Sequence, residues 1–231
     1  MAANRTSTPR AASRARRPIE DDLGRRLRAY REERQISLRE LARRLGISPS
    51  AISQFETGKS RLSVNTLYAI VTELEISLDT LFDGIGEEGT SPAARVEDAS
   101  RETAEPVAPH ERHVQRGHRR SSIELETGVR WERLMPESDR EADFLYVIYD
   151  VGGSSCQGDA FIRHAGHEFG LVLSGALEVT VGFDVYTLGP GDSISFDSTV
   201  PHRLRNIGTE PVHGVWFVAG RQSDPRASTA S

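Results

Sequence analysis

A polar face centred on Gln54 carries side chains of the types that read DNA base edges. Four residues of a short predicted helix point away from its apolar side, namely Pro49, Ser50, Ser53 and Gln54. A glutamine amide pairs bidentately with adenine, and a serine hydroxyl donates to or accepts from several base edges. Lysine and arginine bind the phosphate backbone, which makes candidates of Arg39, Arg43, Lys59 and Arg61 in the flanking segments.

Helix signals surround this face. Ser37-Leu-Arg-Glu40 has the pattern of a capping box, and Gly46 ends the apolar stripe that follows it. Ser48 and Pro49 are typical of a helix start, and Ile52 and Phe55 of the new helix should face a core. Similar signals predict five short helices within residues 19–82, which make a compact all-α unit.

Residues 37–59 read SLRELARRLGISPSAISQFETGK and resemble the helix-turn-helix of the Cro/C1-type (XRE) regulators. The resemblance implies that Pro49, Ser50 and Gln54 occupy base-contacting positions in the major groove. Pro49 has no side-chain donor, so more of the recognition would depend on DNA shape. Two alternatives stay open, namely a helical scaffold without DNA binding and a merely solvated face for each Arg or Lys.

From about residue 121 the pattern changes to short β-strands separated by glycine-containing turns. The strand-like runs are 144–151, 169–173, 176–181, 185–188, 193–196 and 215–218. Many short strands without intervening helices indicate a β-sandwich or barrel. We expect the aromatic residues Tyr146, Phe161, Phe183 and Tyr186 to pack in its core.

Two segments of this region resemble the two motifs of the cupin superfamily. The first contains His164, Glu168 and Gly175, and the second runs from Gly191 through His202 to Asn206. The first histidine of the cupin motif is replaced by Ile162, so the full four-ligand set is absent. The resemblance therefore implies an incomplete site of His164, Glu168 and His202.

Two imidazoles and one carboxylate are a ligand set for Fe(II) or another divalent metal. Two other interpretations remain. These side chains can line a metal-free pocket that hydrogen-bonds a small polar effector, or they can simply satisfy one another.

Charge and composition divide the chain further. Residues 1–18 contain five arginines and no acid, whereas the residues after Phe82 contain 24 acidic and 14 basic side chains. We predict a disordered basic arm (1–18), a helix-turn-helix domain (19–84), a flexible linker (85–120), a cupin sensor domain (121–221) and a disordered tail (222–231). The longest apolar run has six residues, which excludes a membrane span, and the single cysteine excludes a disulfide framework.

The predicted fold class is thus a two-domain protein with an N-terminal all-α helix-turn-helix bundle and a C-terminal all-β cupin barrel, a double-stranded β-helix. This order resembles the bacterial XRE-cupin transcriptional regulators. It implies a cytoplasmic, nucleoid-associated homodimer that binds a double-stranded DNA operator and a small-molecule effector, with no catalytic residue and no membrane partner.

The alternative is a mononuclear non-haem iron enzyme that resembles hydroxypropylphosphonate epoxidase. The catalytic lysine of that enzyme aligns with Gln35, and the only lysine of this chain is Lys59. An interaction scaffold is the third interpretation.

Overall fold

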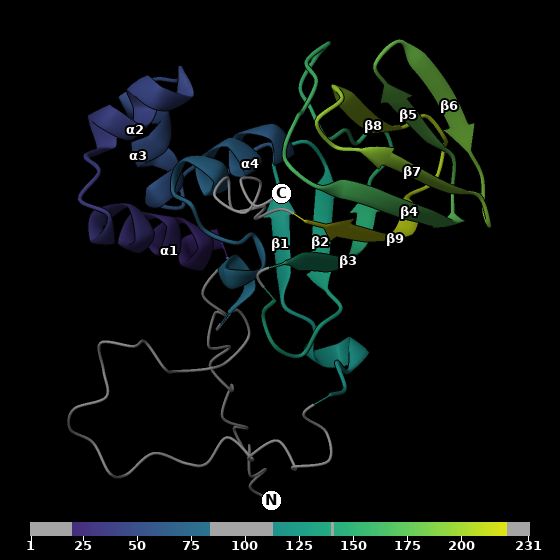
Figure 1. Ribbon diagram of the computed structural model, residues 1–231, viewed down its shortest axis with the longest axis horizontal. Helices are drawn as coiled ribbons and strands as arrows, with labels where there is room; N and C mark the ends of the chain where they lie inside the picture. Colours follow the sequence, from purple (N-terminus) through teal and green to yellow (C-terminus); the bar gives the residue numbers. More distant parts are fainter. Residues whose placement is uncertain (1–19, 84–112, 140, 221–231) are drawn as a thin grey trace, which may run out of the picture.

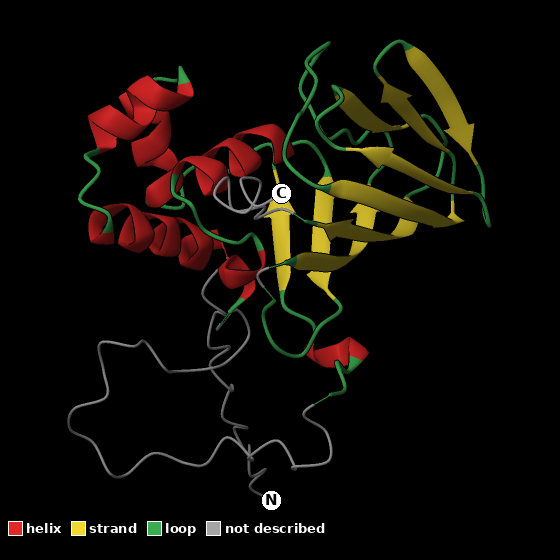
Figure 2. Ribbon diagram, in the orientation of Figure 1, coloured by secondary structure: helices red, strands yellow, loops and turns green. Residues whose placement is uncertain are grey.

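The computed structural model describes residues 20–83, 113–139 and 141–220. The expected basic arm (1–18), the tail (222–231) and most of the expected linker (85–112) lie outside these residues. The remainder of that linker, residues 113–120, contains a short 3₁₀ turn, Gly117–Arg119. Figure 2 shows the N-terminal helices on one side of the molecule and the strands on the other, with the short 3₁₀ turn below the strands. This is the arrangement expected for an all-α unit followed by an all-β unit.

The N-terminal unit contains four α-helices and one short 3₁₀ helix. They are α1 (Glu20–Glu33), α2 (Leu38–Leu45), α3 (Pro49–Glu56), α4 (Val64–Glu73) and η1 (Asp79–Phe82). The fifth predicted helix is therefore a single 3₁₀ turn. None of the helices described is long and apolar enough to cross a bilayer.

Serine caps begin three of these helices, as the sequence predicts. Ser37, Ser48 and Ser63 each accept a backbone N–H of the first helical turn, and Gly46 ends α2 in the left-handed conformation. The capping box at Ser37 is only half formed. The carboxylate of Glu40 accepts hydrogen bonds from Arg43 and Arg44 instead.

Nine strands form the C-terminal unit (Figure 1). They are β1 (Ser122–Leu125), β2 (Val129–Arg133), β3 (Ala142–Tyr149), β4 (His167–Ser174), β5 (Leu177–Val181), β6 (Asp184–Leu188), β7 (Ser193–Asp197), β8 (His202–Asn206) and β9 (Val212–Ala219). A six-stranded sheet has the order β1-β2-β3-β9-β4-β7, and a three-stranded sheet has the order β6-β5-β8. Among the described residues, the two sheets do not close into one continuous hydrogen-bonded barrel.

Buried apolar residues of the two units form one continuous cluster. The backbone N–H of Glu126, in the β1–β2 turn, donates to the carbonyl of Leu62 just before α4 (2.9 Å). On the other side of the junction, Arg133 of β2 contacts Asp83 (2.7 Å) and lies 3.7 Å from Asp79. The helical unit is therefore docked against the β unit at both ends of the segment that contains α4.

Several aromatic residues expected in the core are exposed instead. Phe183 is fully exposed in the turn before β6, and Phe161 and Tyr186 are 40% and 45% exposed. Phe183 lies in a hairpin turn, Tyr186 on the outer face of β6 and Phe161 in the loop between β3 and β4, and only tertiary pairing determines which positions face outward.

Candidate functional site

Strand pairing brings together the three residues of the incomplete cupin set. Glu168 is the second residue of β4, His202 begins β8, and His164 lies in the loop before β4. The backbones of Ile162 and His202 exchange two hydrogen bonds, of 2.9 and 3.0 Å. The N–H of His164 donates to the carbonyl of Ser198 (3.1 Å), so the histidine loop is fixed to the loop before β8.

Three ligand atoms converge in a nearly dry space. The Nε2 atoms of His164 and His202 lie 2.9 and 3.0 Å from Oε1 of Glu168, and the side chains are 4%, 0% and 5% exposed respectively. Ile162, at the position of the fourth cupin ligand, is buried and contributes no donor atom.

Backbone carbonyls determine which nitrogen of each imidazole carries the proton. Nδ1 of His164 lies 3.0 Å from the carbonyl of Ala165, and Nδ1 of His202 lies 2.9 Å from the carbonyl of Val200. A carbonyl only accepts, so each Nδ1 must donate, and in a neutral ring Nε2 is then an unprotonated lone pair.

Two lone pairs and a carboxylate oxygen repel one another unless positive charge lies among them. A divalent cation supplies that charge, and so do additional protons on the histidines. Burial alone would raise the pKa of Glu168, but in the second case the hydrogen bonds and charge of the protonated histidines outweigh burial and hold this pKa well below its usual range. The residues therefore fit a divalent ion with open coordination positions.

Trp216 of β9 holds the second carboxylate oxygen in place. Its Nε1 donates to Oε2 of Glu168 at 2.7 Å, so only Oε1 is directed at the histidines. A partner of this kind orients a ligating carboxylate and raises metal affinity. Gly170 makes room for the indole, because a Cβ at that position would overlap the ring of Trp216.

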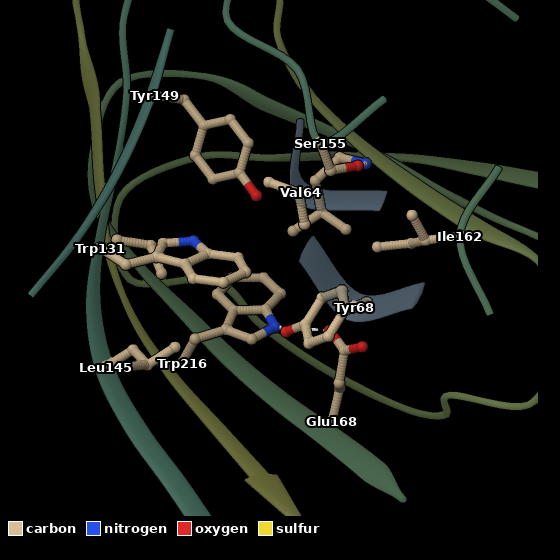
Figure 3. A pocket seen from close by; sticks show the side chains of 11 residues that line it. Val64, Tyr68, Trp131, Leu145, Tyr149, Ser155, Ile162, Glu168 and Trp216 are labelled. Carbon is tan, nitrogen blue, oxygen red and sulfur yellow. Dashed lines mark hydrogen bonds between the residues drawn. The ribbon is translucent and has the colours of Figure 1, made fainter. Parts of the chain in front are cut away.

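A small aromatic pocket adjoins these three residues (Figure 3). Its lining comprises Val64, Tyr68, Trp131, Leu145, Val147, Tyr149, Ser155, Ile162, Glu168, Leu204 and Trp216. Val64 and Tyr68 come from α4 of the helical unit. Sequence reasoning missed these two residues and the Trp131 and Tyr149 walls, because motif spacing points only to ligand atoms. Tyr146, which we expected in the core, is half-buried and hydrogen-bonds His213.

The second candidate site is the exposed face of α3. Ser50, Ser53 and Gln54 are exposed, as is Pro49 at the first helical position, whereas Ile52 and Phe55 are buried. This division matches the predicted inner and outer faces.

The basic residues around α3 are also exposed. Arg39 and Arg43 lie on α2, and Lys59 and Arg61 follow α3. Arg43 makes an ion pair with Glu40 (2.6 Å), so a phosphate would have to compete with that carboxylate.

Comparisons with known proteins agree with this architecture. A helix-turn-helix model matches residues 27–81, and a cupin domain model matches residues 145–218. The HTH-type transcriptional regulator PuuR of Escherichia coli is 24% identical over 79% of this chain and 86% of its own length. An uncharacterized transcriptional regulator from the ATPase CF(0) region of Rhodospirillum rubrum is 30% identical over 33% of this chain and 71% of its own.

A crystal structure of an HTH_3 family transcriptional regulator from Vibrio cholerae has the same fold. It aligns with a TM-score of 0.58 at 19% identity, over 87% of this chain and 96% of that chain. The fold and the two matched domains define a helix-turn-helix protein with a cupin domain. The chain belongs to the XRE-type family of transcriptional regulators that carry a C-terminal cupin domain.

Proposed function

We propose that this regulator reads an operator with the exposed face of α3 and senses a small-molecule effector in its cupin domain. The observation that carries the proposal is the presence, in one chain, of an exposed polar face on α3 and of three buried ligand atoms that converge in the cupin domain. The exposed amide of Gln54 supports the first part, and the convergence of His164, Glu168 and His202 supports the second.

Base recognition is tested with Gln54→Ala on the operator recovered by genome-wide footprinting. Losing a bidentate base contact costs about 1–3 kcal/mol, which weakens operator binding about 5- to 150-fold and leaves binding to random DNA unchanged. Asn65→Ala, which removes an exposed amide from α4, is the matched control. Equal losses on operator and random DNA would contradict base reading by Gln54.

The donor set supports a divalent metal at His164, Glu168 and His202. When bound, such an ion would offer open coordination positions to an effector. We expect His164→Ala to abolish stoichiometric metal in purified protein, as measured by elemental analysis. His167→Ala is the control, because His167 lies beside Glu168 on β4 with its side chain exposed. Unchanged metal content in His164→Ala would reject this site.

The outer face of the six-stranded sheet supports a homodimer. Phe144, Phe217 and Phe169 lie in one cross-strand row over β3, β9 and β4, and Leu171 and Val215 continue the apolar face. Phe169 and Leu171 are 46% and 38% exposed. The three eight-residue strands β3, β9 and β4 are about 27 Å long and together about 14 Å wide, so their outer face covers roughly 400 Å². That is about half of the ~800 Å² per partner of a standard interface, and the flanking strands β2 and β7 would supply the remainder.

Polar residues border this face, with Arg130 and Glu132 on β2 and Ser195 and Asp197 on β7. An aromatic centre with a polar rim is typical of protein interfaces. We expect a dimer by light scattering at micromolar concentration and a monomer for Phe169→Glu. Val185→Glu, on the outer face of β6, is the control. A monomeric wild type, or a Phe169→Glu variant that remains dimeric, would contradict this interface.

The enzyme alternative makes a different prediction. The three-ligand set is also compatible with oxygen chemistry at iron. Oxygen consumption by the iron-loaded chain with a phosphonate substrate, together with no footprint on genomic DNA, would favour it over the regulator.

A further inference from the structure

The DNA-reading unit contributes one wall of the cupin pocket. Val64 and Tyr68 lie one turn apart on α4, are 1% and 6% exposed, and face the β unit. The Tyr68 ring centroid lies 4.3 Å from that of His164 and 5.5 Å from that of Trp131. Figure 3 shows Tyr68 beside Trp216 and the Glu168 carboxylate. A side chain of the DNA-binding domain thus packs on one of the three convergent residues.

Contacts across the junction hold this wall in place. Before α4, the N–H of Glu126 donates to the carbonyl of Leu62. After α4, the N–H of Asp139 donates to Oδ2 of Asp79 at 2.8 Å, and the hydroxyl of Ser77 donates to the carbonyl of Asp139 at 3.1 Å. Tyr68 therefore cannot leave the pocket by a large shift of α4 without loosening at least one of these contacts.

The space left in the pocket is small. Its free volume is about 20 Å³, which holds one water molecule or an ion but no organic molecule. By comparison, the hollow between α3 and α4 measures about 260 Å³. An organic ligand at the three convergent residues must displace a wall, and the wall that belongs to another domain is the one made by Val64 and Tyr68.

We propose that an organic ligand at the cupin site and the docked position of the DNA-reading domain exclude each other. Entry of the ligand displaces Tyr68 and releases α4 from the sheets. The ligand class is a small molecule with a metal-ligating head, such as a carboxylate or imidazole nitrogen, and an apolar body that packs on Trp131 and Trp216. This inference rests on the proposed metal site and adds to it the means by which the site controls the DNA-binding domain.

The displacement reaches the recognition helix through the chain itself. Residues 57–63 connect α3 directly to α4, and Lys59 at the start of this connection donates its backbone N–H to the carbonyl of Gln54 (2.8 Å). When α4 leaves the sheets, α3 is freed from its fixed position relative to the cupin domain. In a dimer joined through the cupin domains, this changes the spacing of the two recognition helices.

The test uses the full chain loaded with Co²⁺ and titrated with imidazole as the organic probe. Both tryptophans of the chain, Trp131 and Trp216, line the pocket, so their fluorescence reports binding together with the Co²⁺ absorption bands. Hydrogen exchange at the backbone amides of Glu126 and Asp139 reports docking, because both amides donate across the junction. We expect imidazole binding to wild type to accelerate exchange at both amides.

Variants at Tyr68 separate this coupling from a purely structural role. Tyr68→Ala opens the pocket, so we expect imidazole to bind about tenfold tighter or more, without faster exchange at the junction. Tyr68→Trp fills the pocket and should weaken binding. Tyr186→Ala removes an exposed tyrosine from β6 and is the control.

Equal imidazole affinity in wild type, Tyr68→Ala and Tyr68→Trp would overturn the inference. Imidazole binding to wild type without faster exchange at either amide would overturn it as well. In both cases Co²⁺ binding would leave the proposed metal site standing. Failure of Co²⁺ to bind wild type would instead reject the metal site and, with it, the inference.

Discussion

A buried ion pair between α1 and α3 holds the recognition helix in place. The Arg31 guanidinium donates from Nε to Oε1 of Glu56 at 2.6 Å and from Nη2 to Oε2 at 2.8 Å. Its Nη1 donates to the carbonyl of Ile36 at 2.9 Å. The two charged side chains are 8% and 5% exposed, so if one partner is removed, little water can reach the other.

Removing one partner should therefore be costly. Arg31→Met leaves the Glu56 carboxylate buried without its two guanidinium donors. Breaking a buried pair in this way lowers the free energy of unfolding by about 3–5 kcal/mol. In the double variant Arg31→Met/Glu56→Met both charges are gone, and because two apolar side chains of similar length fill the space, we expect the variant to recover most of that loss.

Urea unfolding followed by far-UV circular dichroism measures these changes in the helical unit. The control is Arg43→Met, whose pair with Glu40 is solvent-exposed (the Arg43 side chain is 72% exposed) and should contribute far less to stability than the buried pair. Two results would refute the reasoning. One is a loss in Arg31→Met no larger than in Arg43→Met, and the other is a double variant no more stable than Arg31→Met.

Three further predictions follow from single contacts. Burial raises the pKa of Asp79 from 3.8 to about 7. Between these two values the native chain keeps a proton that the unfolded chain has released. The free energy of unfolding therefore falls as pH rises through this range, by at most about 1.4 kcal/mol per pH unit. Asp79→Asn should reduce this slope in urea unfolding between about pH 4 and pH 7, and an unchanged slope would exclude Asp79 as its source. Gly170→Ala should displace Trp216 and weaken Co²⁺ binding about 10- to 100-fold in a spectroscopic titration, whereas Gly117→Ala, with open space around its Cβ, should leave it unchanged. Ser48→Ala removes the N-cap of α3 and should cost about 1 kcal/mol in the same unfolding assay; no loss would mean that water replaces the cap.

Local sequence signals predict the helical unit well. The caps at Ser37, Ser48 and Ser63 and the glycine at the end of α2 act within one turn of their own positions, so sequence alone locates those ends. The capping box also predicts that the Glu40 side chain accepts the backbone N–H of Ser37. This prediction was wrong, because Arg43 and Arg44 of the next turn compete for the Glu40 carboxylate. A short pattern does not include such competitors.

The β unit was predicted less completely. Strands β3 to β7 and β9 coincide with apolar or alternating runs, but β1, β2 and β8 were missed. β8 reads HRLRN, and its alternating burial arises only through pairing with β5. The residues that contact His164, Glu168 and His202 could not be identified from the sequence either, because these contacts also arise only from tertiary packing. Tyr68 lies 96 positions before His164, in a different domain, and no local pattern links the two.

The domain junction combines apolar packing with a buried carboxylate. Its apolar part, Val64 and Tyr68 against the pocket, favours docking. Burial of the Asp79 carboxylate costs free energy that Arg133 and the backbone N–H of Asp139 offset only in part, which is why its pKa is raised to about 7. A ligand shifts a two-state equilibrium only by its difference in affinity for the two states, which for small molecules is a few kcal/mol. In the proposed switch, the cost of burying this carboxylate brings the docked state closer to the range within which an occupant of the pocket can release the DNA-reading domain.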